Sequence, residues 1–93
     1  MWEIYEHRRV SKQLISLPVE ILKRYEKWKD IAKISGPGGL RFINGFHDEA
    51  LRGEWKGFRS SRLSINYRII YKIVEMDILV QVISITSHDY RRK

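Results

Sequence analysis

Cysteine is absent from this chain of 93 residues, which excludes disulfide bonds and metal sites built on thiolates. A chain without cysteine is compatible with a reducing cytoplasm. Apolar runs are short, and none approaches the roughly 20 residues that a helix needs to cross a bilayer. The stretch from Met1 to His7 lacks the basic and apolar regions of a signal peptide. We therefore expect a soluble, cytoplasmic protein without a membrane partner.

Proline and low-complexity sequence are also scarce. The chain has two prolines, and no internal repeat or Pro/Ser-rich linker divides it. Its length is that of one domain, and its apolar content of 43% is normal for a globular protein. We expect residues 1–93 to form a single domain with one modest core.

Acidic residues are in the minority. Eighteen Lys and Arg residues against eleven Asp and Glu give a net charge of +7, which favours a polyanionic partner. Charge alone leaves RNA, DNA, an acidic protein and an anionic membrane surface open. The excess is concentrated in residues 52–72, where cations alternate with aromatic side chains, a pattern that suits a phosphodiester backbone and its bases. The cations are Arg52, Lys56, Arg59, Arg62, Arg68 and Lys72, and the aromatics are Trp55, Phe58, Tyr67 and Tyr71.

The N-terminal half predicts a strand followed by two helices. Residues 2–7 alternate as a short strand does, and residues 8–15 can begin a helix. Residues 17–34 carry apolar side chains at helical spacing, with charged side chains between them. Pro18 suits the first turn of this helix, and the run from Gly36 to Gly39 ends it.

The C-terminal half predicts three consecutive strands at residues 58–64, 67–75 and 78–86, with turns between them. Residues 46–57 are expected to be an irregular connection, in which glycines permit tight bends. This order predicts an α+β fold in which the N-terminal strand and helix pair pack on one face of a small, mostly antiparallel sheet. The opposite face is left open.

Strand alternation suggests which side chains share a face. Arg68 and Lys72 project to one side of their strand, and Tyr67 and Tyr71 to the other. Arg62 meets Arg68 only in one register of the hairpin between them, and the sequence does not determine that register.

Three stretches of the C-terminal half together resemble a known family. They are Leu51 to Arg59, the strand from Tyr67 to Lys72, and the segment from Ile83 to Tyr90. They are similar to the RelE/ParE toxin superfamily, especially its YoeB-like and YafQ-like ribonuclease members, and the N-terminal half is similar in layout. The resemblance implies a RelE-like toxin of a type II toxin–antitoxin system, an endoribonuclease (mRNA interferase) that cuts mRNA on the ribosome. The implied partners are a cognate antitoxin, the ribosome with its rRNA, and mRNA.

The resemblance also implies the catalytic residues. Such a nuclease activates a ribose 2′-hydroxyl, stabilises charge on the phosphate and protonates the departing 5′-oxygen. Glu49 matches the general base, Arg68 the phosphate-binding arginine, and His88 the general acid near the C-terminus. A guanidinium fork suits non-bridging oxygens, and an imidazole, with an ordinary pKa of about 6.5, can hold and release a proton at neutral pH.

Further residues are expected to bind RNA. Lys56, Arg59 and Arg62 would add phosphate contacts, and Tyr90 would stack on or orient a base. YafQ-like members carry histidines where this chain has Glu49 and Arg62. YoeB-like members place a tyrosine directly after the terminal histidine, where this chain has Asp89, so the aromatic role either moves to Tyr90 or is lost.

Other interpretations remain open. A ParE-like inhibitor of DNA gyrase without ribonuclease activity, or a non-catalytic RNA-binding module, would use the same basic sheet. His47, Asp48 and Glu49 are possible metal ligands, but consecutive residues seldom converge on one ion, so neither a metal nor another cofactor is expected. Trp55 is expected to be a core anchor that fixes the turn carrying Glu49.

Overall fold

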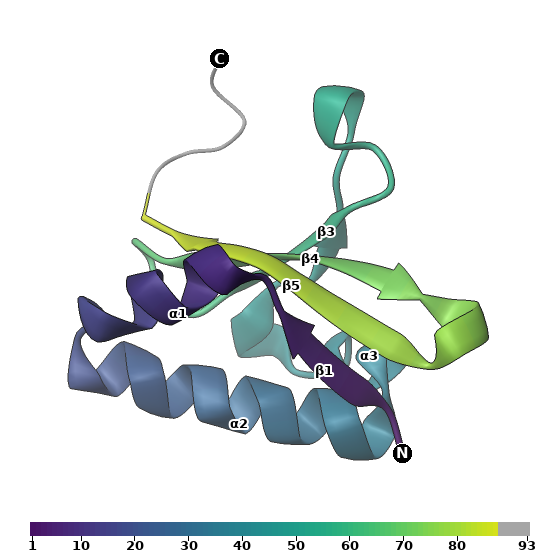
Figure 1. Cartoon of the computed structure of the whole chain (residues 1–93), viewed down its shortest axis with the longest axis horizontal. Helices are drawn as coiled ribbons and strands as arrows, with labels where there is room; N and C mark the ends of the chain where they lie inside the picture. Colours follow the sequence, from purple (N-terminus) through teal and green to yellow (C-terminus); the bar gives the residue numbers. More distant parts are fainter. Residues whose placement is uncertain (88–93) are drawn as a thin grey trace.

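Within residues 1–87, a five-stranded sheet covered on one face by helices is the framework (Figure 1). The computed structural model describes residues 1–87. The strand order is β1-β5-β4-β3-β2, with β1 parallel to β5 and the other neighbouring pairs antiparallel. This arrangement confirms the expected α+β fold. The strands are β1 (Glu3–Glu6), β2 (Glu49–Ala50), β3 (Arg59–Arg62), β4 (Arg68–Val74) and β5 (Leu79–Thr86).

The first helix, α1 (Arg8–Ile15), has the bounds that the sequence predicts. His7 lies just before it, and the Nδ1 atom of His7 accepts a hydrogen bond of 3.1 Å from the backbone N–H of Arg9. This bond satisfies one of the amide groups that every helix start leaves without a partner. The sequence placed His7 on the predicted strand, so its capping role is a finding of the structure.

The second helix, α2 (Val19–Ser35), begins two residues later than predicted. Pro18 has an extended backbone conformation and occupies the N-cap position, just before the first turn. It ends at Gly36, which has a φ of 74°. A Cβ atom on Gly36 would lie 2.7 Å from the indole nitrogen of Trp2, so this position needs glycine for conformation and for space. The glycine-rich run ends α2 as predicted, but it also begins the short helix α3 (Pro37–Leu40).

The main core lies between α2 and the inner face of the sheet. Tyr25, Trp28 and Ala32 are fully buried along one side of α2, which confirms the predicted apolar stripe. The ring of Trp28 meets Tyr71 of β4 edge-on, with ring centroids 5.2 Å apart. Truncation of such a buried aromatic typically costs about 3–5 kcal/mol, so this contact is central to the attachment of α2.

A β-bulge interrupts the pairing of β4 with β5. Ile70 lies opposite Ser84 and Tyr71 opposite Val82, which leaves Ile83 as the extra residue. Val82 and Ile85 are therefore both in the core although they are three positions apart. Beyond Val82, the side chains of β5 therefore no longer follow the simple alternation between the two faces of the sheet that the sequence pattern predicts.

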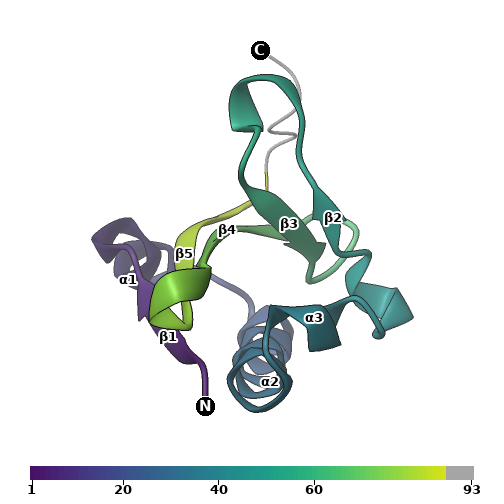
Figure 2. The ribbon, with the colours of Figure 1, turned by 90° about the vertical axis from the view of Figure 1, so that its right-hand side faces the viewer.

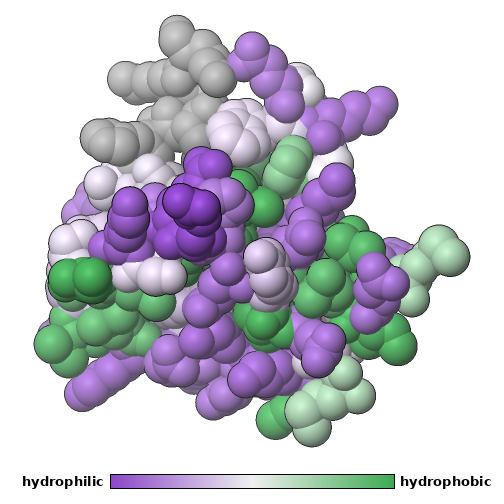
Figure 3. All heavy atoms as spheres, viewed as in Figure 1, coloured by the Kyte–Doolittle hydropathy of each residue, from purple (hydrophilic) through white to green (hydrophobic). Residues whose placement is uncertain are grey.

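Exposed apolar side chains gather at opposite ends of the molecule in the view of Figure 3. Ile15 and Val19 lie at the connection between α1 and α2, and Met76 and Ile78 lie at the turn between β4 and β5. The surface between these ends is mainly hydrophilic (Figure 3). Among residues 1–87, no helix has both the length and the apolar character that crossing a membrane requires.

Candidate active site

The strand register brings three of the predicted residues to the open face of the sheet. Arg62 lies directly opposite Arg68, and Glu49 lies opposite Ser60. Residues opposite each other share a face, as do residues two apart in one strand. Ser60 and Arg62 therefore project to the same side as Glu49, and Arg68 joins them. Thr86, opposite Arg68, completes this row on the face that the helices leave open.

The two arginines of this row form a site that favours an anion. Two guanidinium groups directly opposite each other concentrate positive charge on this part of the sheet. The Nε atom of Arg62 is buried and has no hydrogen-bond partner among residues 1–87. A phosphate group would supply both the negative charge and the acceptor oxygens that a guanidinium fork matches.

A glycine-flanked loop, residues 51–58, rises above the open face (Figure 2). The backbone N–H of Leu51 donates to the carbonyl of Phe58 at 2.9 Å and closes the loop on itself. Gly53 has a φ of 65° and Gly57 a φ of 95°, which confirms the predicted tight bends. Lys56 is exposed on this loop, so its ammonium group is accessible above the sheet.

A second, smaller core holds the loop down. Leu51 and Ile70 are buried together on the open side, with Trp55 and Phe58 packed against them. The rings of Trp55 and Phe58 meet edge-on, with their centroids 5.7 Å apart. The Nζ atom of Lys72 lies 5.7 Å from the centroid of the Phe58 ring. Trp55 therefore packs as an apolar anchor of the turn, and it does so in this small core and not in the main one.

Glu49 lies in a strand, which corrects the prediction that residues 46–57 form an irregular connection. The strand β2 pairs Glu49 with Ser60 and Ala50 with Arg59. Two residues are too few to show an alternating pattern in the sequence, so only the pairing with β3 reveals the strand. The pairing gives the Glu49 backbone a fixed place at the edge of the sheet.

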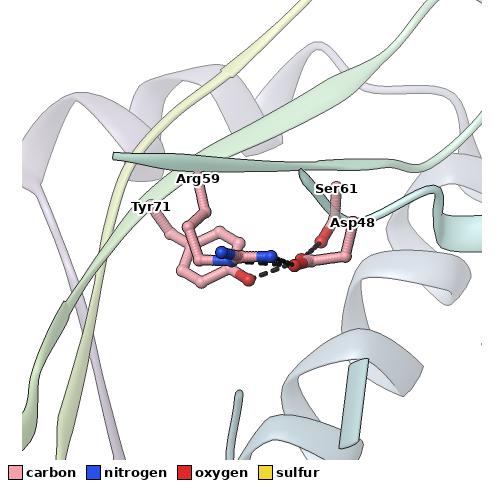
Figure 4. A network of polar contacts seen from close by, with 4 residues as sticks. All are labelled: Asp48, Arg59, Ser61 and Tyr71. Carbon is pink, nitrogen blue, oxygen red and sulfur yellow. Dashed lines mark hydrogen bonds and ion pairs between the residues drawn. The ribbon is translucent and has the colours of Figure 1, made fainter. Parts of the chain in front are cut away.

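Asp48, the residue before Glu49, is the centre of a buried polar network (Figure 4). Its side chain has no exposed surface. Arg59 donates to the Oδ1 atom of Asp48 from Nε at 2.9 Å and from Nη2 at 2.6 Å. The Oδ2 atom accepts from the Ser61 hydroxyl at 2.6 Å and from the Tyr71 hydroxyl at 2.5 Å. Both carboxylate oxygens of Asp48 are thus satisfied, as a buried charge requires.

The protonation states of the network follow from its geometry. Burial, reinforced by the negative charge of Asp48, raises the pKa of Tyr71, so the phenol remains a hydrogen-bond donor. Burial lowers the pKa of Arg59, but the hydrogen bonds and charge of Asp48 outweigh this effect and leave it above its ordinary value. Arg59 and Asp48 therefore form a charged pair with Tyr71 as a neutral donor.

This network was missed by sequence reasoning, although a signal was present. Arg59 and Ser61 alternate with Ser60 and Arg62, so two polar side chains of β3 project toward the helix-covered face. Polar groups on a buried face need a buried partner, and Asp48 is that partner. The guanidinium of Arg59 is bound there, on the side opposite Arg62, and its predicted contact with RNA stays a prediction.

The three consecutive residues at positions 47–49 do not converge on one point. Asp48 projects to the covered side and Glu49 to the open side. Within the part of the chain that the structure describes, no group of three or more His, Cys, Asp or Glu side chains is placed to hold a metal ion. His88 and Tyr90 lie outside the described residues, so their predicted roles stay predictions.

No protein-family model matches the sequence, and no curated protein matches it with significant similarity. Solved structures do match the fold. One is a chain of the archaeal RelE–RelB complex from Pyrococcus horikoshii OT3, with a TM-score of 0.77 and 24% identity over 96% of this chain and 97% of that one. A chain of the heterotetrameric YoeB–YefM toxin–antitoxin complex from Staphylococcus aureus matches with a TM-score of 0.73 and 16% identity, over 96% of this chain and 99% of that one. YafQ from E. coli strain BL21(DE3) matches with a TM-score of 0.67 and 19% identity, over 95% of this chain and 94% of that one. The chain therefore has the fold of the RelE, YoeB and YafQ proteins.

Proposed function

We propose that this protein is the toxin of a type II toxin–antitoxin system and acts as a ribosome-dependent endoribonuclease on mRNA. The observation that carries the proposal is the row of Glu49, Arg62 and Arg68 on the open face of a RelE-like fold. This row offers a proton acceptor beside two phosphate ligands on one surface. The net charge of +7 supplies the attraction for rRNA that ribosome binding needs.

In the proposed reaction, the Glu49 carboxylate accepts the proton of a ribose 2′-hydroxyl. The resulting oxygen nucleophile attacks the adjacent phosphorus, and the bond from phosphorus to the 5′-oxygen breaks. Arg68 stabilises the negative charge on the non-bridging oxygens while this bond is exchanged. His88 gives its proton to the departing 5′-oxygen. The products are a 2′,3′-cyclic phosphate and a free 5′-hydroxyl.

Other residues of the basic surface hold the RNA in this proposal. Arg62 and Lys56 contact phosphates beside the cut, and Tyr90 orients a base. Few catalytic residues suffice because the ribosome itself orders the mRNA, which supplies much of the positioning that an isolated enzyme would have to provide.

The proposed inhibitor is an antitoxin with an acidic segment. The RelE–RelB and YoeB–YefM structures are complexes. An acidic chain that lies across the basic open face would be steered there by charge and would cover the row of Glu49, Arg62 and Arg68.

The test is induced expression in a bacterium with mapping of mRNA 5′-ends in translating ribosomes. Wild type should cut inside open reading frames. His88→Ala should reduce cutting by about 10²- to 10⁴-fold, the usual contribution of a general acid or base, and Glu49→Ala and Arg68→Ala should also reduce it. The control is Arg41→Ala, which removes an exposed arginine after α3, on the helix side of the fold. Growth arrest with intact mRNA, unchanged by these substitutions, would transfer the proposal to a ParE-like inhibitor of gyrase.

A further inference from the structure

We infer that Asp48 is a positioning residue for Glu49: from the covered face it fixes β2 so that the Glu49 carboxylate stays beside Arg62 and Arg68. This inference rests on the proposed role of Glu49. It concerns a residue that touches neither the RNA nor the reacting atoms.

The strand that carries Glu49 needs such an anchor. It has two residues and lies at the edge of the sheet, with β3 as its neighbour. Short edge strands open locally at little free-energy cost. Ala50 is exposed, and its methyl group belongs to neither core. With the β3 pairing alone, Glu49 would be free to shift by distances of about 1 Å, which are large enough to slow catalysis.

Asp48 is this anchor, because three side chains from two neighbouring strands hold its carboxylate in place. Arg59 and Ser61 of β3 and Tyr71 of β4 donate four hydrogen bonds of 2.5 to 2.9 Å to its two oxygens. Tyr71 is itself held by the ring of Trp28. A continuous set of contacts therefore runs from Trp28 of α2 through Tyr71 to Asp48, the residue before Glu49. Figure 4 shows the part of it that surrounds Asp48.

The geometry of the chain transmits this restraint. Asp48 and Glu49 are adjacent in the backbone and project to opposite faces, so a shift of the Asp48 backbone moves Glu49 with it. The consequence for catalysis is large, because a misplacement of about 1 Å can cost on the order of 100-fold in rate.

The rival explanation is that the network stabilises the fold and nothing more. The molecule contains a matched control for that explanation. On the far edge of the sheet, the hydroxyl of Tyr25 donates to the Oε2 atom of Glu6 at 2.5 Å, and Lys29 pairs with the same atom at 3.3 Å. This network also joins a tyrosine, a carboxylate and a cation. Its carboxylate belongs to β1, the strand at the opposite edge of the sheet from β2, and its other two members belong to α2.

The experiment measures single-turnover cleavage of mRNA in programmed ribosomes, at a temperature where circular dichroism shows every variant folded. Tyr71→Phe should lower the maximal rate by about tenfold and Asp48→Asn by up to about 100-fold, with ribosome affinity unchanged. Tyr25→Phe, the matched control, should stay within about twofold. If Asp48→Asn does not fold, Tyr71→Phe decides the question. Equal losses in Tyr71→Phe and Tyr25→Phe would overturn the inference.

A double-mutant cycle separates this inference from the proposed function. Glu49→Gln alone should be strongly impaired, and adding Tyr71→Phe to it should cause no further loss, because the second change acts through Glu49. If the two effects multiply, Asp48 acts by another route and the inference is wrong. If Glu49→Gln cleaves at the wild-type rate, the proposed role of Glu49 fails first and the inference fails with it.

Discussion

Two networks of tyrosine, carboxylate and cation lie at opposite edges of one sheet, and their chemistry is nearly identical. At the β1 edge, the hydroxyl of Tyr25 donates to Glu6 at 2.5 Å and Lys29 lies 3.3 Å from it. At the β2 edge, Tyr71 donates to Asp48 at 2.5 Å and Arg59 lies 2.6 Å from it. They differ in burial, since the Glu6 side chain is 32% exposed and that of Asp48 is 0% exposed.

The difference in burial gives the two networks different roles. Water can replace a lost partner of Glu6, so that network ties α2 to β1 at modest cost. The Asp48 side chain is inaccessible to water, so water does not replace a lost donor there. The planar guanidinium of Arg59 also binds its carboxylate in one fixed orientation, whereas the ammonium of Lys29 acts as a point charge and fixes no orientation. The rigid network is the one beside the candidate active site.

The largest contrast is expected from removing each carboxylate. Asp48→Ala removes the fully buried carboxylate and leaves the guanidinium of Arg59, whose side chain is 17% exposed, without its counter-charge. The change should lower the free energy of unfolding by about 3–5 kcal/mol. The Glu6 side chain is 32% exposed, so water can take the place of the lost carboxylate, and Glu6→Ala should cost about 1 kcal/mol. Urea denaturation of both variants and wild type measures these values. Equal losses would show that burial does not distinguish the two networks.

Alkaline pH should destabilise both networks. Burial, aided by the hydrogen bond from Tyr25 to Glu6, raises the pKa of Tyr25, and burial with the charge of Asp48 raises that of Tyr71. Above a pH of about 10 the unfolded tyrosines lose their protons while the folded ones keep them. The stability is complete below that pH and falls above it by about 1.4 kcal/mol per pH unit for each tyrosine.

Phenylalanine variants isolate this effect from the titration of lysines. Tyr25→Phe and Tyr71→Phe should each flatten the decline in the free energy of unfolding above a pH of about 10, measured by urea denaturation at a series of pH values. A decline as steep in both variants as in wild type would mean that neither hydroxyl is held protonated by the fold.

A smaller effect is expected at Ser61, whose hydroxyl donates to Asp48 at 2.6 Å. Ser61→Ala removes one donor and leaves those of Arg59 and Tyr71, so the cost should be about 1 kcal/mol. Thermal and urea denaturation measure it. A loss as large as that of Asp48→Ala would show that the network cannot tolerate any missing donor.

The smallest effect is expected at Glu26, whose Oε2 atom lies 3.1 Å from the Nζ atom of Lys29 while its side chain is 63% exposed. Exposed pairs at this helical spacing contribute little. Glu26→Gln should change the free energy of unfolding by less than about 0.5 kcal/mol. A larger loss would mean that the β1 network is more strongly coupled than its exposure indicates.

The elements that the sequence predicts well are those with local causes. The apolar stripe of α2 follows from spacing within one segment. The strand β2 and the bulge at Ile83 do not, because both are defined by pairing with residues distant in the chain. Local pattern contains no information on which residue of a neighbouring strand lies opposite.

The candidate site divides in the same way. The resemblance identified Glu49 and Arg68, but only the register shows that Arg62 lies opposite Arg68 and that Glu49 shares their face. Asp48 was considered only as a metal ligand. Its role depends on the contact of three segments, of which the alternation of Arg59 and Ser61 was the one visible sign.

The parallel pairing of β1 with β5 has a consequence for how the chain folds. Glu3 pairs with Leu79, so the first strand finds its partner only in the last one. Closing so long a loop costs entropy before any contact compensates for it, and such non-local pairing slows folding. A nascent chain can form α1 and α2 early, but it cannot complete the sheet until β5 has left the ribosome that makes it.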